Sequence, residues 1–66
     1  METEVITHRQ WDNYAARIER KNLKERGHSL TRASIAYRAN SYIIEIREDT
    51  MIVRTGWREA MRNEDE

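Results

Sequence analysis

Few side chains in this chain have the type and spacing that catalysis or metal binding requires. The histidines, His8 and His28, flank a predicted helix, and a rise of 1.5 Å per residue would separate them by about 30 Å, too far to share a metal ion. The chain has no Cys, which excludes disulfides and cysteine zinc sites. Gly27 and Gly56 are isolated, so there is no glycine-rich phosphate loop.

The hydroxyl and carboxyl groups give no catalytic motif either. None of the serines, Ser29, Ser34 and Ser41, lies in a nucleophile-elbow sequence. Most acidic residues fall in predicted turns and tails, where solvent leaves their acidity ordinary. The sequence therefore predicts a protein without enzymatic activity, cofactor, metal ion or small-molecule substrate.

Length, charge and hydropathy further limit the kinds of protein that this chain can be. With 66 residues the chain forms one domain, residues 1–66, and buries only about 60% of its unfolded surface, so a second subunit would help its stability. Twelve basic and twelve acidic side chains balance, so overall charge gives no case for nucleic acid. The longest apolar runs have three residues, as from Tyr42 to Ile44, far short of the ~20 residues of a membrane span. The acidic start METE is no signal peptide, and we expect a soluble, cytoplasmic protein.

The clearest predicted element is a helix over residues 8–26. Thr7 and Gln10 have the spacing of a capping box, and Gly27 is the residue that most readily ends a helix. The apolar side chains spaced to face a core are Trp11, Tyr14, Ala15 and Ile18.

From Leu30 onward the hydrophobic period changes to two, which predicts three antiparallel strands over residues 31–39, 42–47 and 51–55. A short helix follows over residues 56–62, and an acidic tail covers residues 63–66. The predicted fold is α+β, an N-terminal amphipathic helix packed on a three-stranded antiparallel β-sheet with a short C-terminal helix. The alternative, a second helix from Ser29 to Ile46, places β-branched and aromatic residues unfavourably.

The predicted turns would align two rows of core side chains across the sheet: Ile35 with Ile46 and Met51, and Tyr37 with Ile44 and Val53. The same register places Ile43 and Ile52 on the opposite face. Arginines surround these two side chains, as in many protein interfaces. This predicted arginine-rimmed face consists of Arg32, Arg38, Ile43, Arg47, Ile52 and Arg54.

The second candidate surface is a basic stripe on the long helix. Its members are Arg9, Arg17, Arg20, Lys21 and Lys24. Arg17 with Lys21, and Arg20 with Lys24, are like-charge pairs four residues apart, which destabilise an isolated helix. Nucleic-acid phosphates, an acidic partner protein or the chain's own acidic ends could neutralise the stripe; solvent and salt could also simply screen it.

These surfaces favour a small regulator or inhibitor that binds another protein and forms a homodimer. The small size is also compatible with an origin in a phage or other mobile element. The alternative is a small nucleic-acid-binding regulator, although the predicted sheet directs Tyr37 and Tyr42 toward the core rather than toward bases. The partner's identity stays open at this point.

Overall fold

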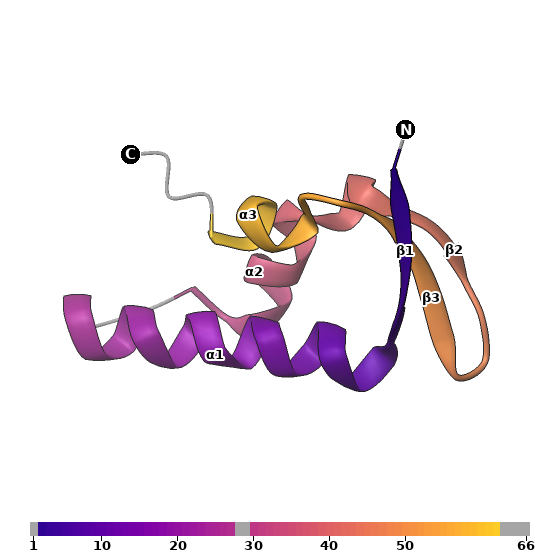
Figure 1. Ribbon diagram of the computed structural model, residues 1–66. Helices are drawn as coiled ribbons and strands as arrows, with labels where there is room; N and C mark the ends of the chain where they lie inside the picture. The colour runs from indigo at the N-terminus through magenta and orange to yellow at the C-terminus, as the bar shows by residue number, and fades with distance from the viewer. Residues whose placement is uncertain (1, 28–29, 63–66) are drawn as a thin grey trace.

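The computed structural model describes residues 2–27 and 30–62 and has an α+β fold (Figure 1). A long helix, a three-stranded antiparallel sheet and a short C-terminal helix are all present, which confirms the predicted fold class. The elements are β1 (Thr3–Thr7), α1 (His8–Arg26), α2 (Arg32–Arg38), a 3-10 turn η1 (Asn40–Tyr42), β2 (Ile43–Ile46), β3 (Thr50–Arg54) and α3 (Trp57–Arg62). Within the described residues no helix has the length and apolar character needed to cross a membrane.

Both ends of α1 are set by the residues that the sequence indicated. The Gln10 backbone N–H donates to the Thr7 hydroxyl at 3.0 Å, and the Thr7 N–H donates to the Gln10 side-chain oxygen at 2.8 Å, which completes the capping box. Gly27 ends the helix with a φ of 81°, a left-handed conformation that glycine adopts without steric cost.

The sheet has the order β1-β3-β2, and its first strand precedes α1. β1 pairs with β3 over its whole length, from Thr3 opposite Arg54 to Thr7 opposite Thr50. The sequence prediction placed the first strand at residues 31–39, and that prediction is wrong. Residues 3–7 instead form a strand of the sheet, in which the exposed Thr3, Val5 and Thr7 alternate with the half-buried Glu4 and the buried Ile6.

Residues 32–38 form the helix α2 because a local cap competes successfully with strand propensity. The Thr31 hydroxyl accepts the Ser34 backbone N–H at 3.1 Å, and also donates to the Ser34 hydroxyl at 3.0 Å. The helix buries Ile35 fully, whereas Tyr37 is 76% exposed. Tyr37 therefore does not belong to a core row, and the all-helical alternative was correct only for this segment, since residues 43–46 are strand.

An irregularity in β2 changes which isoleucine meets the core. Ile46 lies opposite Met51, as predicted, but it is 64% exposed and so does not belong to the predicted core row. Ile43 rather than Ile44 lies opposite Val53 because the register shifts between Ile43 and Glu45. A bulge of this kind inserts one extra residue into one strand. Consequently Ile43 packs against the core and Ile44 is 49% exposed, the reverse of the predicted assignment.

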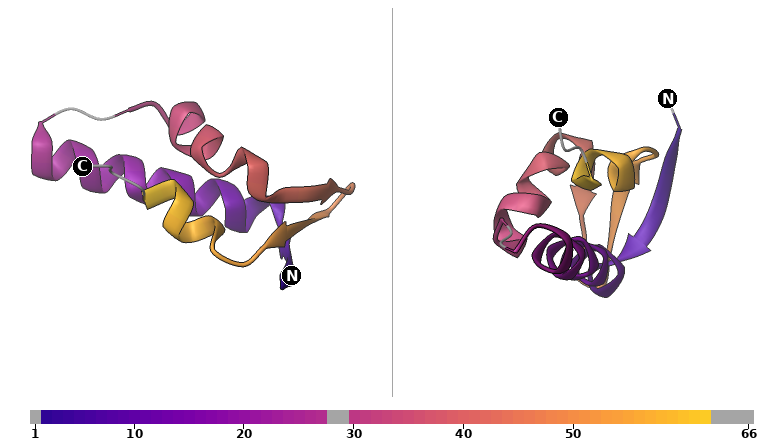
Figure 2. Two further views of the ribbon diagram at one scale, coloured as in Figure 1. Left: turned by 90° about the horizontal axis from the view of Figure 1, so that it is seen from above. Right: turned by 90° about the vertical axis from the view of Figure 1, so that its left-hand side faces the viewer.

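The core lies where the three helices meet one face of the sheet. In the right-hand view of Figure 2, the helices lie in front of the sheet and α1 is seen almost end-on, so this helix projects away from the strands. α1 packs against α2 and also contacts α3 and β1. The buried apolar cluster consists of Ile6, Ala15, Ile18, Ile35, Ala39, Met51, Val53, Trp57 and Met61.

Candidate interaction surfaces

Of the two histidines, the structure describes His8. The His8 ring nitrogen Nε2 lies 2.7 Å from the Arg47 carbonyl oxygen, an exposed hydrogen bond that ties α1 to the β2–β3 turn. His28 and Ser29 lie outside the described residues. Among residues 2–27 and 30–62, no three His, Cys, Asp or Glu side chains gather as a metal site would require.

The basic stripe is present as a continuous exposed face of α1. All five of its side chains, those of Arg9, Arg17, Arg20, Lys21 and Lys24, are exposed. Within the described residues none of the five takes part in an ion pair or side-chain hydrogen bond. The acidic tail at residues 63–66, which could neutralise the stripe, lies outside the described residues.

Arginines elsewhere on the molecule are used differently, because six of them have a partner within the fold. Arg38 donates to the Met61 carbonyl at 3.0 Å, near the end of α3. Arg54 lies over the Tyr42 ring at 4.9 Å. The arginines in ion pairs are Arg32, Arg47, Arg58 and Arg62. Among residues 2–27 and 30–62, the lack of partners along the stripe is therefore a property of that surface and not of arginines generally.

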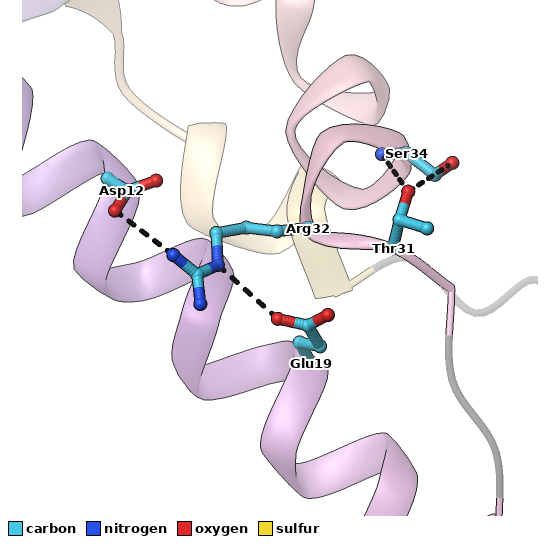
Figure 3. A network of polar contacts seen from close by, with 5 residues as sticks. All are labelled: Asp12, Glu19, Thr31, Arg32 and Ser34. Atoms are coloured by element: carbon cyan, nitrogen blue, oxygen red, sulfur yellow. Dashed lines mark hydrogen bonds and ion pairs between the residues drawn. The ribbon is translucent and has the colours of Figure 1, made fainter.

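Arg32 was predicted to lie on an exposed binding face, but in the structure it forms ion pairs within the fold. Its guanidinium lies 3.4 Å from an Asp12 carboxylate oxygen and 3.3 Å from a Glu19 carboxylate oxygen, so it joins α2 to α1 (Figure 3). Arg32 and Arg38 were predicted on a sheet face, and this placement is wrong because residues 32–38 are helical. The predicted arginine-rimmed face therefore does not exist as a unit.

The face of the sheet that points away from the helices carries fewer arginines than the predicted arginine-rimmed face. Alternation from the buried Ile6, Met51 and Val53 places Val5 and Ile52 on this side, and the two are cross-strand neighbours. We call it the open sheet face, and its members are Thr3, Val5, Thr7, Glu45, Thr50, Ile52 and Arg54. Of the apolar pair predicted here, Ile52 is placed as expected, whereas Ile43 packs against the core.

Arg47 lies beside this face, in the turn that joins β2 to β3. Its Nε donates to a Glu45 carboxylate oxygen at 2.9 Å. That hydrogen bond, together with the attraction between the two charges, raises the pKa of Arg47 above its ordinary value. Arg47 is thus charged at every physiological pH and is paired locally, so its charge is largely compensated.

A shallow pocket lies where the basic stripe meets α3. Side chains from α1 and α3 line it: Gln10, Asn13, Tyr14, Arg17, Trp57 and Arg58. Of these residues, only Arg17 belongs to the predicted sites. The others were missed because residues 10–17 and 57–58 are far apart in sequence and meet only through packing of α3 on α1. Neither Gly56 nor Trp57, the first residue of α3, gave a signal for this contact.

Comparison with known proteins assigns no family to this arrangement: no protein-family model, curated protein or solved structure matches the chain.

Proposed function

We propose that this chain is a small non-enzymatic regulator or inhibitor that binds an acidic partner protein through the basic stripe. The observation that carries the proposal is the contrast among its cations. Five basic side chains lie on one helix face without an ionic partner in the described residues, while six arginines elsewhere are paired or stacked.

The energetics of the helix support the proposal. The like-charge pairs Arg17 with Lys21 and Arg20 with Lys24 each cost a few tenths of a kcal/mol. Arg9 adds a positive charge to the first turn of α1, which contains no acidic residue, although the helix dipole favours negative charge there. An acidic partner would relieve all of these terms at once, which gives the stripe a reason to bind.

The experiment compares the chain with a stripe-reversed variant, Arg17→Glu with Arg20→Glu and Lys24→Glu. Each protein is immobilised and incubated with nuclease-treated lysate of a candidate host, and captured proteins are quantified by mass spectrometry. We expect an acidic protein that the parent chain captures and the reversed variant loses. The matched control, Arg47→Glu with Arg62→Glu, reverses exposed arginines outside the stripe and should retain capture.

The nucleic-acid alternative is separated by salt. Phosphate contacts release counterions, so binding of duplex DNA or RNA through the stripe would weaken by tenfold or more between low and physiological salt. Such binding would replace our proposal, and its absence at low salt would remove the alternative. A capture pattern that is identical for the parent and the stripe-reversed variant would contradict protein binding through the stripe.

We further propose that two copies of the chain associate through the open sheet face. All three helices lie on the other side of the sheet (Figure 2), and Val5 is 60% exposed although it is a β-branched apolar residue. Small domains bury little surface alone, so a second copy placed on this face would add to a thin core.

A further inference from the structure

The pocket between α1 and α3 has a composition that the basic stripe alone does not explain. Its volume is about 240 Å³, several times the roughly 30 Å³ that one water molecule occupies in the liquid. It is smaller than the roughly 300–1,000 Å³ of sites for drug-sized ligands. The space therefore suits one side chain or a similarly small group.

The polar groups around the pocket are mainly hydrogen-bond donors. The guanidinium groups of Arg17 and Arg58 donate and do not accept. Gln10 uses its side-chain oxygen to accept the Thr7 N–H at 2.8 Å, so its NH₂ group is the end that remains for a ligand. Among the described residues, no carboxylate lines the pocket. A group that complements this lining must carry several acceptor atoms and a negative charge.

Arg58 is held in position before any ligand arrives. Its guanidinium carbon lies 4.4 Å from the Trp57 ring centroid and 5.9 Å from that of Tyr14. One of its terminal nitrogens is 3.7 Å from a Glu4 carboxylate oxygen, which also accepts the Trp57 indole N–H at 3.2 Å. Most of the five donors of this guanidinium remain unused, and a positioned group loses little entropy on binding.

We infer that this pocket binds a carboxylate side chain, Asp or Glu, from an acidic segment of the partner protein. The inference rests on the function proposed above and adds an anchor point to it. Bidentate pairing with guanidinium is the strong form of carboxylate recognition, and two arginines with adjacent amides provide it. A nucleobase fits less well because Trp57 is only 1% exposed and offers no ring face for stacking.

The test uses a capped peptide of alternating Glu and Gly, labelled with a fluorophore, and the same peptide with Gln in place of Glu. Binding is measured by fluorescence anisotropy, and the bound site is mapped by NMR through the indole N–H signal of Trp57. We expect the Glu peptide to bind and shift this signal, and the Gln peptide to do neither. A single-stranded oligonucleotide is tested in parallel.

Two variants place the interaction in the pocket. Arg58→Gln removes a charged donor, and we expect about a tenfold loss of affinity, as for one charge-assisted hydrogen bond. Asn13→Asp introduces a carboxylate into the lining at an exposed, nearly isosteric position and should weaken binding at least as much without disturbing the fold. The control Asn40→Asp makes the same change on an exposed residue that lines a different hollow and should leave binding within about twofold, as screening of a distant charge implies.

The outcomes separate this inference from the function on which it rests. If the stripe-reversed variant loses the peptide but Arg58→Gln and Asn13→Asp keep it, the stripe binds by general charge and the pocket inference is wrong. If none of the three variants changes binding, both proposals fail. If the oligonucleotide shifts the Trp57 signal and the Glu peptide does not, the ligand is not a carboxylate and the inference is overturned.

Discussion

The exposed side of α1 and the open sheet face are both uncovered by the rest of the described chain, yet their chemistry differs. The first carries five cations that have no ionic partner in the described residues, whereas the second has an apolar pair, Val5 and Ile52, among threonines, Arg54 and a locally paired Glu45. A charged surface selects an acidic partner and weakens with salt. A neutral, partly apolar surface suits a second copy and is little affected by salt, so the two surfaces do not compete for one kind of partner.

The largest expected effect is on folding stability, for a residue in the core. The comparison of the two exposed surfaces assumes that the opposite sides of α1 and the sheet are buried in this core. Trp57 is 1% exposed, stacks on Trp11 with ring centroids 5.2 Å apart, and meets Tyr14 edge-on at 5.7 Å. We expect Trp57→Ala to lower the free energy of unfolding by about 3–5 kcal/mol, which would leave so small a domain largely unfolded. Urea titration followed by circular dichroism measures this change.

The control for this prediction is another aromatic residue that the fold does not cover. Tyr37 is 76% exposed on α2, so Tyr37→Ala should change stability by no more than about 0.5 kcal/mol. A loss below about 1 kcal/mol for Trp57→Ala would mean that α3 is not part of the core and that the distinction between covered and open sides is wrong.

The bounds of α1 were predicted well from the sequence because the residues that indicate them lie in the helix or next to it. Thr7, Gln10 and Gly27 act on the helix that they flank, and the spacing of Trp11 and Ile18 needs no knowledge of distant residues. Such signals can be read without a three-dimensional context.

The segments whose secondary structure or facing was predicted wrongly are those in which tertiary contacts decide the outcome. Residues 31–39 alternate in a way that suits a strand, but Ile35 and Ala39, four apart, are the two that become fully buried, which is the helical spacing. β1 has only five residues, too short for a periodic pattern to stand out. The bulge near Ile44 puts Ile43 in place of Ile44 opposite Val53, because one extra residue in β2 shifts the side chains before it to the other face, while Ile46 keeps its predicted partner Met51.

The second prediction addresses the open sheet face. Val5→Asp with Ile52→Asp would place two charges in the proposed interface between copies, and burying unpaired charge is costly. We expect the dimer to dissociate by at least about tenfold in its dissociation constant, a factor that only ~1.4 kcal/mol produces. Analytical ultracentrifugation at low and high salt measures the mass.

The stripe-reversed variant is the control, since it alters the other open surface and should retain the dimer mass. A parent chain that sediments as a monomer at all concentrations would contradict the dimer. Ile43 is unsuitable for this test because it packs against the core, and an Asp there would report on folding instead of association.

A smaller effect is expected for the ion pairs that join α2 to α1. Arg32→Ala removes contacts to Asp12 and Glu19, in which the arginine side chain is 49% exposed and the two carboxylate side chains are 61% and 32% exposed. Solvent screening limits such pairs, and we expect a loss of about 0.5–1 kcal/mol in total. The loss should shrink in high salt, as thermal unfolding at two salt concentrations would show.

The ion pairs of Arg32 also show which features of a site cannot be predicted from the sequence. Whether Arg32 faces solvent or the Asp12 and Glu19 carboxylates depends on where α2 lies against α1, which no local pattern encodes. The basic stripe was predictable because its members share one face of a single helix. The pocket with Arg58 was not, because its walls come from α1 and α3.

The last effect is of similar size, and its sign is the most informative. Arg17→Glu with Arg20→Glu converts two repulsive pairs into two Glu-to-Lys pairs at the favourable four-residue spacing, with Lys21 and Lys24. Each conversion is worth a few tenths of a kcal/mol, so we expect stability to rise by about 0.5–1 kcal/mol. The control, Arg17→Gln with Arg20→Gln, removes repulsion without adding attraction and should give about half of that rise. If stability falls instead, the stripe is neutralised within the chain, and deleting residues 63–66 should then abolish the fall. If the variant gains stability and also loses the partner, Arg17 and Arg20 lower the stability of the fold but contribute to binding. That combination distinguishes a binding surface from a solvated one.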